Sequence, residues 1–330
     1  MVDAAGAEAR AFMEQLPAPA DDGEVLVIQA DGKGAPMISP EEHQRRSQPH
    51  GSDGGADRKA RRARRRKWPR KKRRTKGKKS KNAKLAVAGV IYTLRKTADG
   101  MEGPLNKRLL ATFESHEAAF IWLRSEADKR GYGQKRTLFL GDGSEHLWRM
   151  QQKYFPAAEV CIDWCHIVEK LWKAGECLHE EGTEELKKWV ATQETRLRRG
   201  ESRAIIDELG ERFEKTPKTG PGNKGKRERL EKTINYLTAH KDRMRYAELR
   251  RDDLDIGTGA AEGAVRNLIG IRLDGPGMRW SRQRSERVLH LRCILLNGQW
   301  ADFVKYLGKR PFLKLAAQPA ATITHLAKAA

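Results

Sequence analysis

Three acidic residues spread over most of the chain have the types and positions needed to bind metal ions. Asp31 follows a run of apolar residues that begins at Val25, and Asp142 follows a second such run before a Gly/Ser turn. Glu262 lies in a segment whose apolar residues have helical spacing. Carboxylates from strand ends and a neighbouring helix are the oxygen ligands that Mg²⁺ prefers, and two such ions promote phosphoryl transfer. The pattern therefore predicts a nuclease site with Asp31, Asp142 and Glu262 as ligands of two Mg²⁺ ions, and we expect Mn²⁺ to substitute.

Each of these acids also has a purely structural explanation. An aspartate before glycine commonly forms a turn, which applies to Asp31 and to Asp142. Glu262 stands four residues before Arg266, a spacing typical of a surface pair on a helix that contributes about 0.2–0.5 kcal/mol. The occurrence of all three in one chain favours the metal site.

A second pair of polar residues, Asp163 and His166, follows a short apolar run at 158–162. The pair could bind a metal, contact DNA or form a structural hydrogen-bond network. We favour a supporting role, in which hydrogen bonding orients His166 near the acidic site.

The positive charge of the chain is concentrated in one segment. The formal net charge is +22, and residues 58–81 contain seventeen Lys or Arg and no acid, so the rest carries 22 − 17 = +5. Such a segment repels itself and is expected to be disordered when free. It could be a solvated insertion, a localisation signal or, as we favour, an arm that binds DNA phosphates. Its predicted DNA-binding residues are Arg64, Arg65, Arg66, Lys67, Arg70, Lys71, Lys72, Arg73 and Arg74.

The four cysteines form no C-x-x-C pair, which is typical of a reducing compartment. No apolar stretch approaches the roughly 20 residues that span a bilayer. We therefore expect a soluble intracellular protein without a membrane partner.

The elements that must position the acids follow a recognisable order. Three strands, a helix and a fourth strand predict an α/β fold, a ribonuclease-H-like mixed sheet flanked by helices, with a helical insertion between the second and third acidic residues. In that fold the first and fourth strands end at the metal site. The predicted divisions are a weakly ordered leader (1–23), the first part of the core (24–162) with a basic disordered insertion (33–82), the helical insertion (163–255), the C-terminal core helices (256–310) and a tail (311–330).

Several motifs in order resemble those of the DDE transposases of bacterial insertion sequences, most closely the ISKra-type family. The resemblance covers most of residues 25–305. The motifs that carry it are DGKGAPM (31–37), GDG (141–143) followed by Trp148, FPAA (155–158), DWCHIVEKLW (163–172), IGTG (256–259), EG (262–263), GMRWS (277–281), LR (291–292) and NGQW (297–300).

The resemblance implies a DDE triad that holds magnesium, cuts DNA at element ends and joins the freed 3′ hydroxyl to a target. It implies DNA as partner, a homodimer or larger synaptic complex, and a bacterial cytoplasm with attachment to the nucleoid through DNA. Arg279, within the GMRWS motif, is a further predicted DNA contact, although the adjoining Trp280 could equally pack beneath a helix. Only about thirty residues precede Asp31, fewer than in the family, which points to a truncated reading frame or a fragment.

Two other functional classes remain open at this stage. One is a non-catalytic nucleic-acid-binding protein on a ribonuclease-H-like scaffold. The other is an RNA-binding assembly factor that uses the basic arm without a metal. The intact set of Asp31, Asp142 and Glu262 argues against the first of these.

Overall fold

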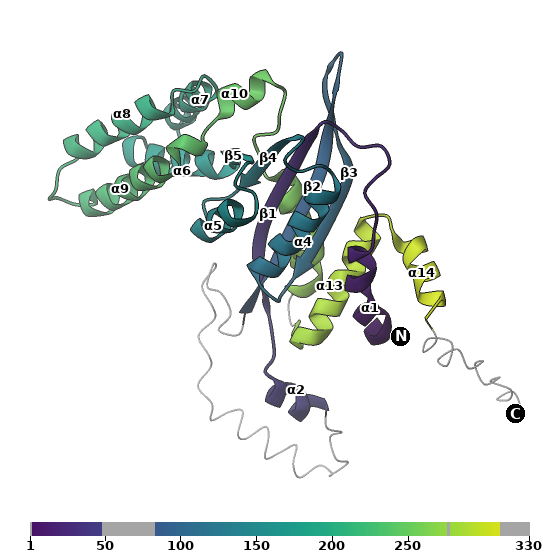
Figure 1. The fold of residues 1–330 in the computed structure, drawn as a ribbon. Coiled ribbons are helices and arrows are strands. Elements are labelled where there is room, and N and C mark those ends of the chain that lie inside the picture. The colour runs from purple at the N-terminus through teal and green to yellow at the C-terminus, as the bar shows by residue number, and fades with distance from the viewer. Residues whose placement is uncertain (1, 48–82, 276–277, 311–330) are drawn as a thin grey trace, which may run out of the picture.

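The computed structural model describes residues 2–47, 83–275 and 278–310 of the chain. Its centre is a five-stranded mixed sheet in the order β3-β2-β1-β4-β5 (Figure 1). The first three strands pair antiparallel, whereas β4 and β5 run parallel to β1. The strands are β1 (Val25–Pro36), β2 (Ala83–Thr97), β3 (Gly100–Thr112), β4 (Arg136–Gly141) and β5 (Glu159–Ile162).

Helices cover both faces of the sheet, which explains why β1, β2 and β4 contain continuous apolar runs rather than alternating ones. The helices α4 and α5 pack on one face, and α11 and α13 pack on the other. Outside α13 lie α1 and α14 (Figure 1). These elements are α1 (Val2–Glu14), α4 (His116–Lys129), α5 (Glu145–Tyr154), α11 (Gly259–Val265), η2 (Arg266–Gly270), α12 (Ile271–Leu273), α13 (Arg282–Leu296) and α14 (Trp300–Gly308).

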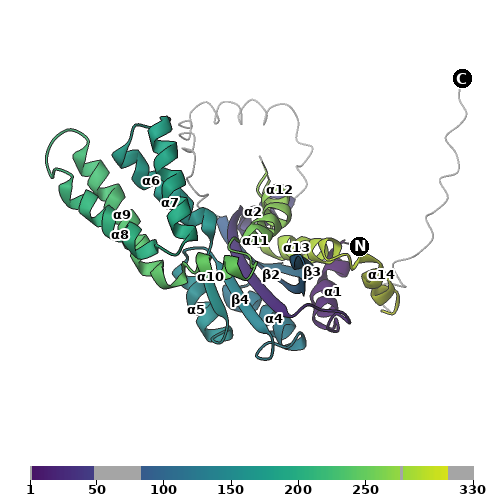
Figure 2. The same ribbon diagram turned by 90° about the horizontal axis from the view of Figure 1, so that it is seen from above.

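The chain between β5 and α11 is helical and projects beyond one side of the sheet (Figures 1 and 2). Its helices pack mainly on one another, with α6 against α7 and α9, and α8 against α9. In the part of the chain that the structure describes, no helix combines the length and apolar character needed to cross a bilayer. The segment comprises α6 (Trp164–Leu178), α7 (Glu184–Arg198), α8 (Ser202–Lys215), α9 (Asn223–His240), η1 (Lys241–Arg243) and α10 (Tyr246–Arg251).

Two expectations about order are wrong. The leader is not weakly ordered, because α1 buries Ala9, Phe12 and Met13 in the core and packs along α13. The predicted basic insertion is not irregular from residue 33, because β1 continues to Pro36 by pairing with β2, and α2 (Pro40–Ser47) follows. The rest of that insertion and the predicted tail lie outside the described residues.

A partly buried carboxylate on α13 attaches this helix to the end of β3. Glu286 accepts hydrogen bonds from the Thr112 hydroxyl and from the Phe113 N–H at 2.6 Å, and it lies 3.1 Å from Nε2 of His290. Burial alone would raise the pKa of Glu286, but the interaction with His290 and the donors at Thr112 and Phe113 outweigh burial and lower it. The negative charge of Glu286 therefore stabilises the fold.

We expect Glu286→Gln to lower the free energy of unfolding at neutral pH by about 1–3 kcal/mol. Because the folded-state pKa is lowered, the contribution of Glu286 is present above its ordinary value of 4.5 and disappears as the pH falls through the lowered value. Urea unfolding as a function of pH should therefore show a smaller acid-induced loss of stability in the variant. The exposed Asp302→Asn serves as the control, and equal acid profiles for wild type and Glu286→Gln would contradict the prediction.

Candidate metal centre

Three aspartates directly follow residues that lie side by side in the sheet. Ala30 of β1 pairs with Gly141 of β4, and Gly141 pairs with Ile162 of β5. The residues that come next are Asp31, Asp142 and Asp163. Because these strands are parallel, their carboxyl ends meet at one edge, and the three acids start from the same edge of the sheet.

One detail of this arrangement differs from the expectation that Asp31 ends a strand. β1 continues past Asp31, which pairs with Ala88 of β2. Pairing with β4 nevertheless stops at Ala30. Asp31 therefore lies at the site because the neighbouring strand β4 ends beside Ala30, and not because β1 ends there.

The third predicted ligand, Glu262, lies in the first turn of α11, on the sheet face that Gln29 also faces. The side-chain Oε1 of Gln29 accepts the N–H of Ala261 at 3.0 Å, and its Nε2 lies 3.3 Å from the Gly257 oxygen. Tyr92 of β2 supports this contact, since its hydroxyl donates to Asp255 and accepts from Gln29 at 3.0 Å. These bonds, of which the two from Ala261 to Gln29 and from Gln29 to Tyr92 are buried, fix the start of α11 on the sheet.

The Asp163 carboxylate joins the starts of α6 and α11. Its Oδ1 accepts the N–H of Thr258 at 2.7 Å, and its Oδ2 accepts the backbone N–H of His166 at 2.9 Å. The same Oδ2 lies 2.7 Å from Nδ1 of His166. Burial opposes ionisation of Asp163, but these donors, led by His166, lower its pKa. Asp163 is therefore an anion whose two oxygens are both engaged by the protein.

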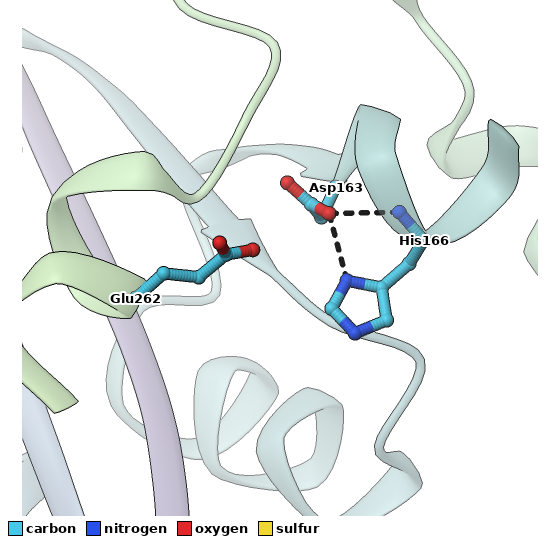
Figure 3. A group of neighbouring side chains, drawn as sticks. All are labelled: Asp163, His166 and Glu262. Carbon is cyan, nitrogen blue, oxygen red and sulfur yellow. Dashed lines mark hydrogen bonds and ion pairs between the residues drawn. The ribbon is translucent and has the colours of Figure 1, made fainter. Parts of the chain in front are cut away.

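Among the described residues, Asp163, His166 and Glu262 form the one group of three possible metal ligands whose ligand atoms lie within 4.8 Å of one another. Figure 3 shows the exposed Glu262 carboxylate pointing toward the Asp163–His166 pair. Asp163 holds Nδ1 of the imidazole and leaves Nε2 available for a proton or a ligand. The hydrogen bond that His166 donates to Asp163 raises the pKa of His166 against the effect of burial. Asp31 and Asp142 are not members of this group.

The pKa of Asp31 nevertheless depends on the other two predicted ligands, Asp142 and Glu262. Burial is the main cause that raises the pKa of Asp31, and the negative charges of Asp142 and Glu262 raise it further. The Gly32 N–H, which donates to Oδ1 at 2.6 Å, and the nearby His166 act in the opposite direction but do not outweigh these causes. Unneutralised carboxylates that repel one another suit a divalent cation, and an oxygen-rich donor set suits Mg²⁺ or Mn²⁺. The carboxylates of Asp31, Asp142 and Glu262 are thus donors of the type that the predicted metal takes, and Mg²⁺ binding by these residues stays a prediction.

We expect Asp31→Asn to stabilise the metal-free protein. The folded-state pKa of Asp31 is raised above the ordinary value of 3.8. Between pH 3.8 and the raised value the folded state binds more protons than the unfolded state, so the free energy of unfolding falls as the pH rises through this range. Removing the charge should raise Tm at neutral pH in a chelator by on the order of a few degrees. Added Mg²⁺ should raise the Tm of wild type more than that of the variant.

The exposed Asp302→Asn provides the control for these thermal measurements, because the carboxylate of Asp302 lies on the surface of α14 and pairs there with Lys305. If Asp31→Asn lowered Tm in the chelator, the negative charge of Asp31 would be stabilising and the repulsion among the three carboxylates would be refuted.

The remaining predicted residues fall in different places. Glu262 makes no ion pair with Arg266 in the described parts of the chain, so the surface-pair explanation does not hold. Arg279 is exposed and donates to the backbone oxygen of Met278 rather than to an acid of the site. The basic residues Arg64–Arg74 lie outside the described residues. The roles of Arg279 and of the basic segment stay predictions.

Sequence reasoning missed the two residues that hold α11 in place, Gln29 and Tyr92. The available signal was a glutamine inside the apolar run that precedes Asp31. A buried amide needs hydrogen-bond partners, and a polar residue at such a position indicates a contact with another segment.

A comparison with models of known protein families finds none that matches this chain, and a comparison with curated proteins finds no match either.

Proposed function

We propose that the protein is a metal-dependent DNA strand transferase of the DDE type, built on a ribonuclease-H-like fold. The observation that carries the proposal is the register of Ala30, Gly141 and Ile162, which starts three aspartates from one sheet edge, opposite Glu262 on α11. The sheet order β3-β2-β1-β4-β5, with three antiparallel strands followed by two parallel ones, supports the ribonuclease-H-like assignment.

In this proposal Asp31, Asp142 and Glu262 hold two Mg²⁺ ions. When bound, such ions activate the attacking oxygen and stabilise the leaving 3′ oxygen of a phosphodiester. Asp163 orients His166 and the start of α11, and Gln29 fixes α11 on the sheet. The reaction consists of hydrolysis of a DNA strand at an element end and attack of the freed 3′ hydroxyl on target DNA. Two or more copies of the chain would hold the two ends.

The proposed activity predicts divalent-metal-dependent cleavage of DNA that flanks the coding region. Labelled duplexes that cover each flank should yield a discrete cut with Mg²⁺ or Mn²⁺ and none with a chelator. Joining to a target plasmid tests the second half of the reaction. Cutting that occurs equally in the chelator would refute the metal centre.

The charge distribution favours one alternative, a nucleic-acid-binding protein that does not cut. Seventeen of the basic residues lie in the segment 58–81, and such a segment binds polyanions without any metal. Salt-dependent binding to both flanking and unrelated DNA, together with no cleavage in Mg²⁺ or Mn²⁺, would establish this alternative.

A further inference from the structure

Lys170 on α6 is a cation that has no carboxylate partner among the described residues. It stands four residues after His166, and residues with this spacing lie on one face of a helix. Its neighbour Glu169 pairs with Lys173 at 3.9 Å, whereas Lys170 makes no ion pair among the described residues. Instead the Lys170 ammonium lies 4.3 Å from the centre of the Tyr236 ring. A half-buried ammonium held over an aromatic face has its charge available for a ligand.

Tyr236 comes from α9, the last long helix of the insertion, and lies against the turn that carries Asp142. A Cβ atom added to Gly143 would lie 2.1 Å from the Tyr236 hydroxyl oxygen, so only glycine leaves room for this side chain. Burial, together with the smaller effects of the charges of Asp142 and Asp163, raises the pKa of Tyr236 to about 12. The hydroxyl therefore keeps its proton, and among the described residues it has no acceptor.

Together, the Lys170 ammonium and the Tyr236 hydroxyl supply a positive charge and a hydrogen-bond donor beside the negative carboxylates. The carboxylates of Asp31, Asp142 and Glu262 repel a phosphodiester, so DNA needs donors next to them to approach. Lys170 supplies a point charge suited to a phosphate, and Tyr236 supplies an O–H donor.

We propose that Lys170 and Tyr236 bind a DNA phosphodiester that lies next to the phosphodiester that is cut. The inference rests on the proposed function for the identity of the ligand as DNA. The helical insertion would then contribute directly to substrate placement, through one residue from its first helix and one from its last long helix.

The test compares Lys170→Gln with Lys173→Gln, a matched control on the same helix whose side chain is exposed and paired with Glu169. Binding of a fluorescein-labelled flanking duplex is measured by anisotropy over a KCl series in a chelator. Loss of one phosphate contact should reduce the slope of log affinity against log salt by about 0.9 in Lys170→Gln and leave it unchanged in Lys173→Gln. Lys170→Arg should keep the wild-type slope. Tyr236→Phe should weaken binding but leave the slope of log affinity against log salt unchanged.

The same variants are then assayed for cleavage in Mg²⁺, where Lys170→Gln should lower kcat about tenfold or more because the phosphate is misplaced. Equal slopes for Lys170→Gln and Lys173→Gln would overturn the inference, whether or not wild type cuts DNA. If wild type binds but does not cut, the proposed function fails, while the difference in slope still decides whether Lys170 binds a phosphate. Thermal unfolding of each variant identifies any loss of binding that arises from loss of the fold.

Discussion

Glu262→Gln is expected to abolish metal-dependent DNA cleavage while leaving DNA binding nearly unchanged. The substitution keeps the size of the side chain but removes the charge that α11 brings to the three aspartates at the sheet edge. A loss of at least about 10³-fold in rate corresponds to roughly 4 kcal/mol of transition-state stabilisation. DNA affinity, measured in a chelator, should change by no more than about twofold, since the carboxylate does not attract phosphate.

The matched control is Glu248→Gln, which removes an exposed carboxylate on α10 that pairs with Arg245. This variant should cut DNA at the wild-type rate. Retained cleavage in Glu262→Gln would remove Glu262 from the proposed metal centre and leave Asp31 and Asp142 as the candidate ligands. Loss of both binding and cleavage would instead indicate that the substitution damages the fold, which thermal unfolding would reveal.

Asp163→Asn is expected to be the most destabilising single change near the site. The carboxylate is fully buried and accepts from the N–H groups of Thr258 and His166, and from the imidazole of His166. An amide offers one acceptor oxygen and directs an NH₂ group toward the other donors. Breaking a buried charged network of this kind costs about 3–5 kcal/mol, which chemical denaturation should detect.

The same substitution should also lower the cleavage rate at temperatures where the variant remains folded, because Asp163 positions both His166 and the start of α11. Asp128→Asn, on the exposed surface of α4, provides the control and should change neither property. A fully stable Asp163→Asn with normal cleavage would show that the carboxylate is dispensable for joining the two helices.

The sequence predicted the sheet well because its strands are unusually apolar. The runs that lead to Asp31 and Asp142, and the buried strand around Val90, have no competing helical pattern, and all three form strands. The order of these strands with the helix at 115–130 was enough to predict an α/β fold with a mixed sheet. The alignment of Ala30 with Gly141 could not be predicted, because register depends on pairing across more than a hundred residues.

The contacts around the site were harder to predict from the sequence. Asp163 and His166 were expected to act together, and the structure places them in hydrogen-bond contact. Their proximity to Glu262 depends on the N–H of Thr258, ninety-five residues away in the chain, and no local pattern encodes such a contact. The leader was misjudged for a similar reason, because α1 is stable only when Phe12 and Met13 pack against helices at the far end of the chain.

The helical segment 164–255 enters and leaves the core at almost the same point. The N–H of Trp164 donates to the oxygen of Ile256 at 3.0 Å, so the two ends of this segment are joined by a direct backbone hydrogen bond. The segment is also bonded to β5 directly, since the Tyr246 hydroxyl donates to the oxygen of Ile162 at 3.1 Å. We therefore expect any movement of the projecting helices to reach Asp163 and the start of α11, which adjoin the hydrogen bond between Trp164 and Ile256.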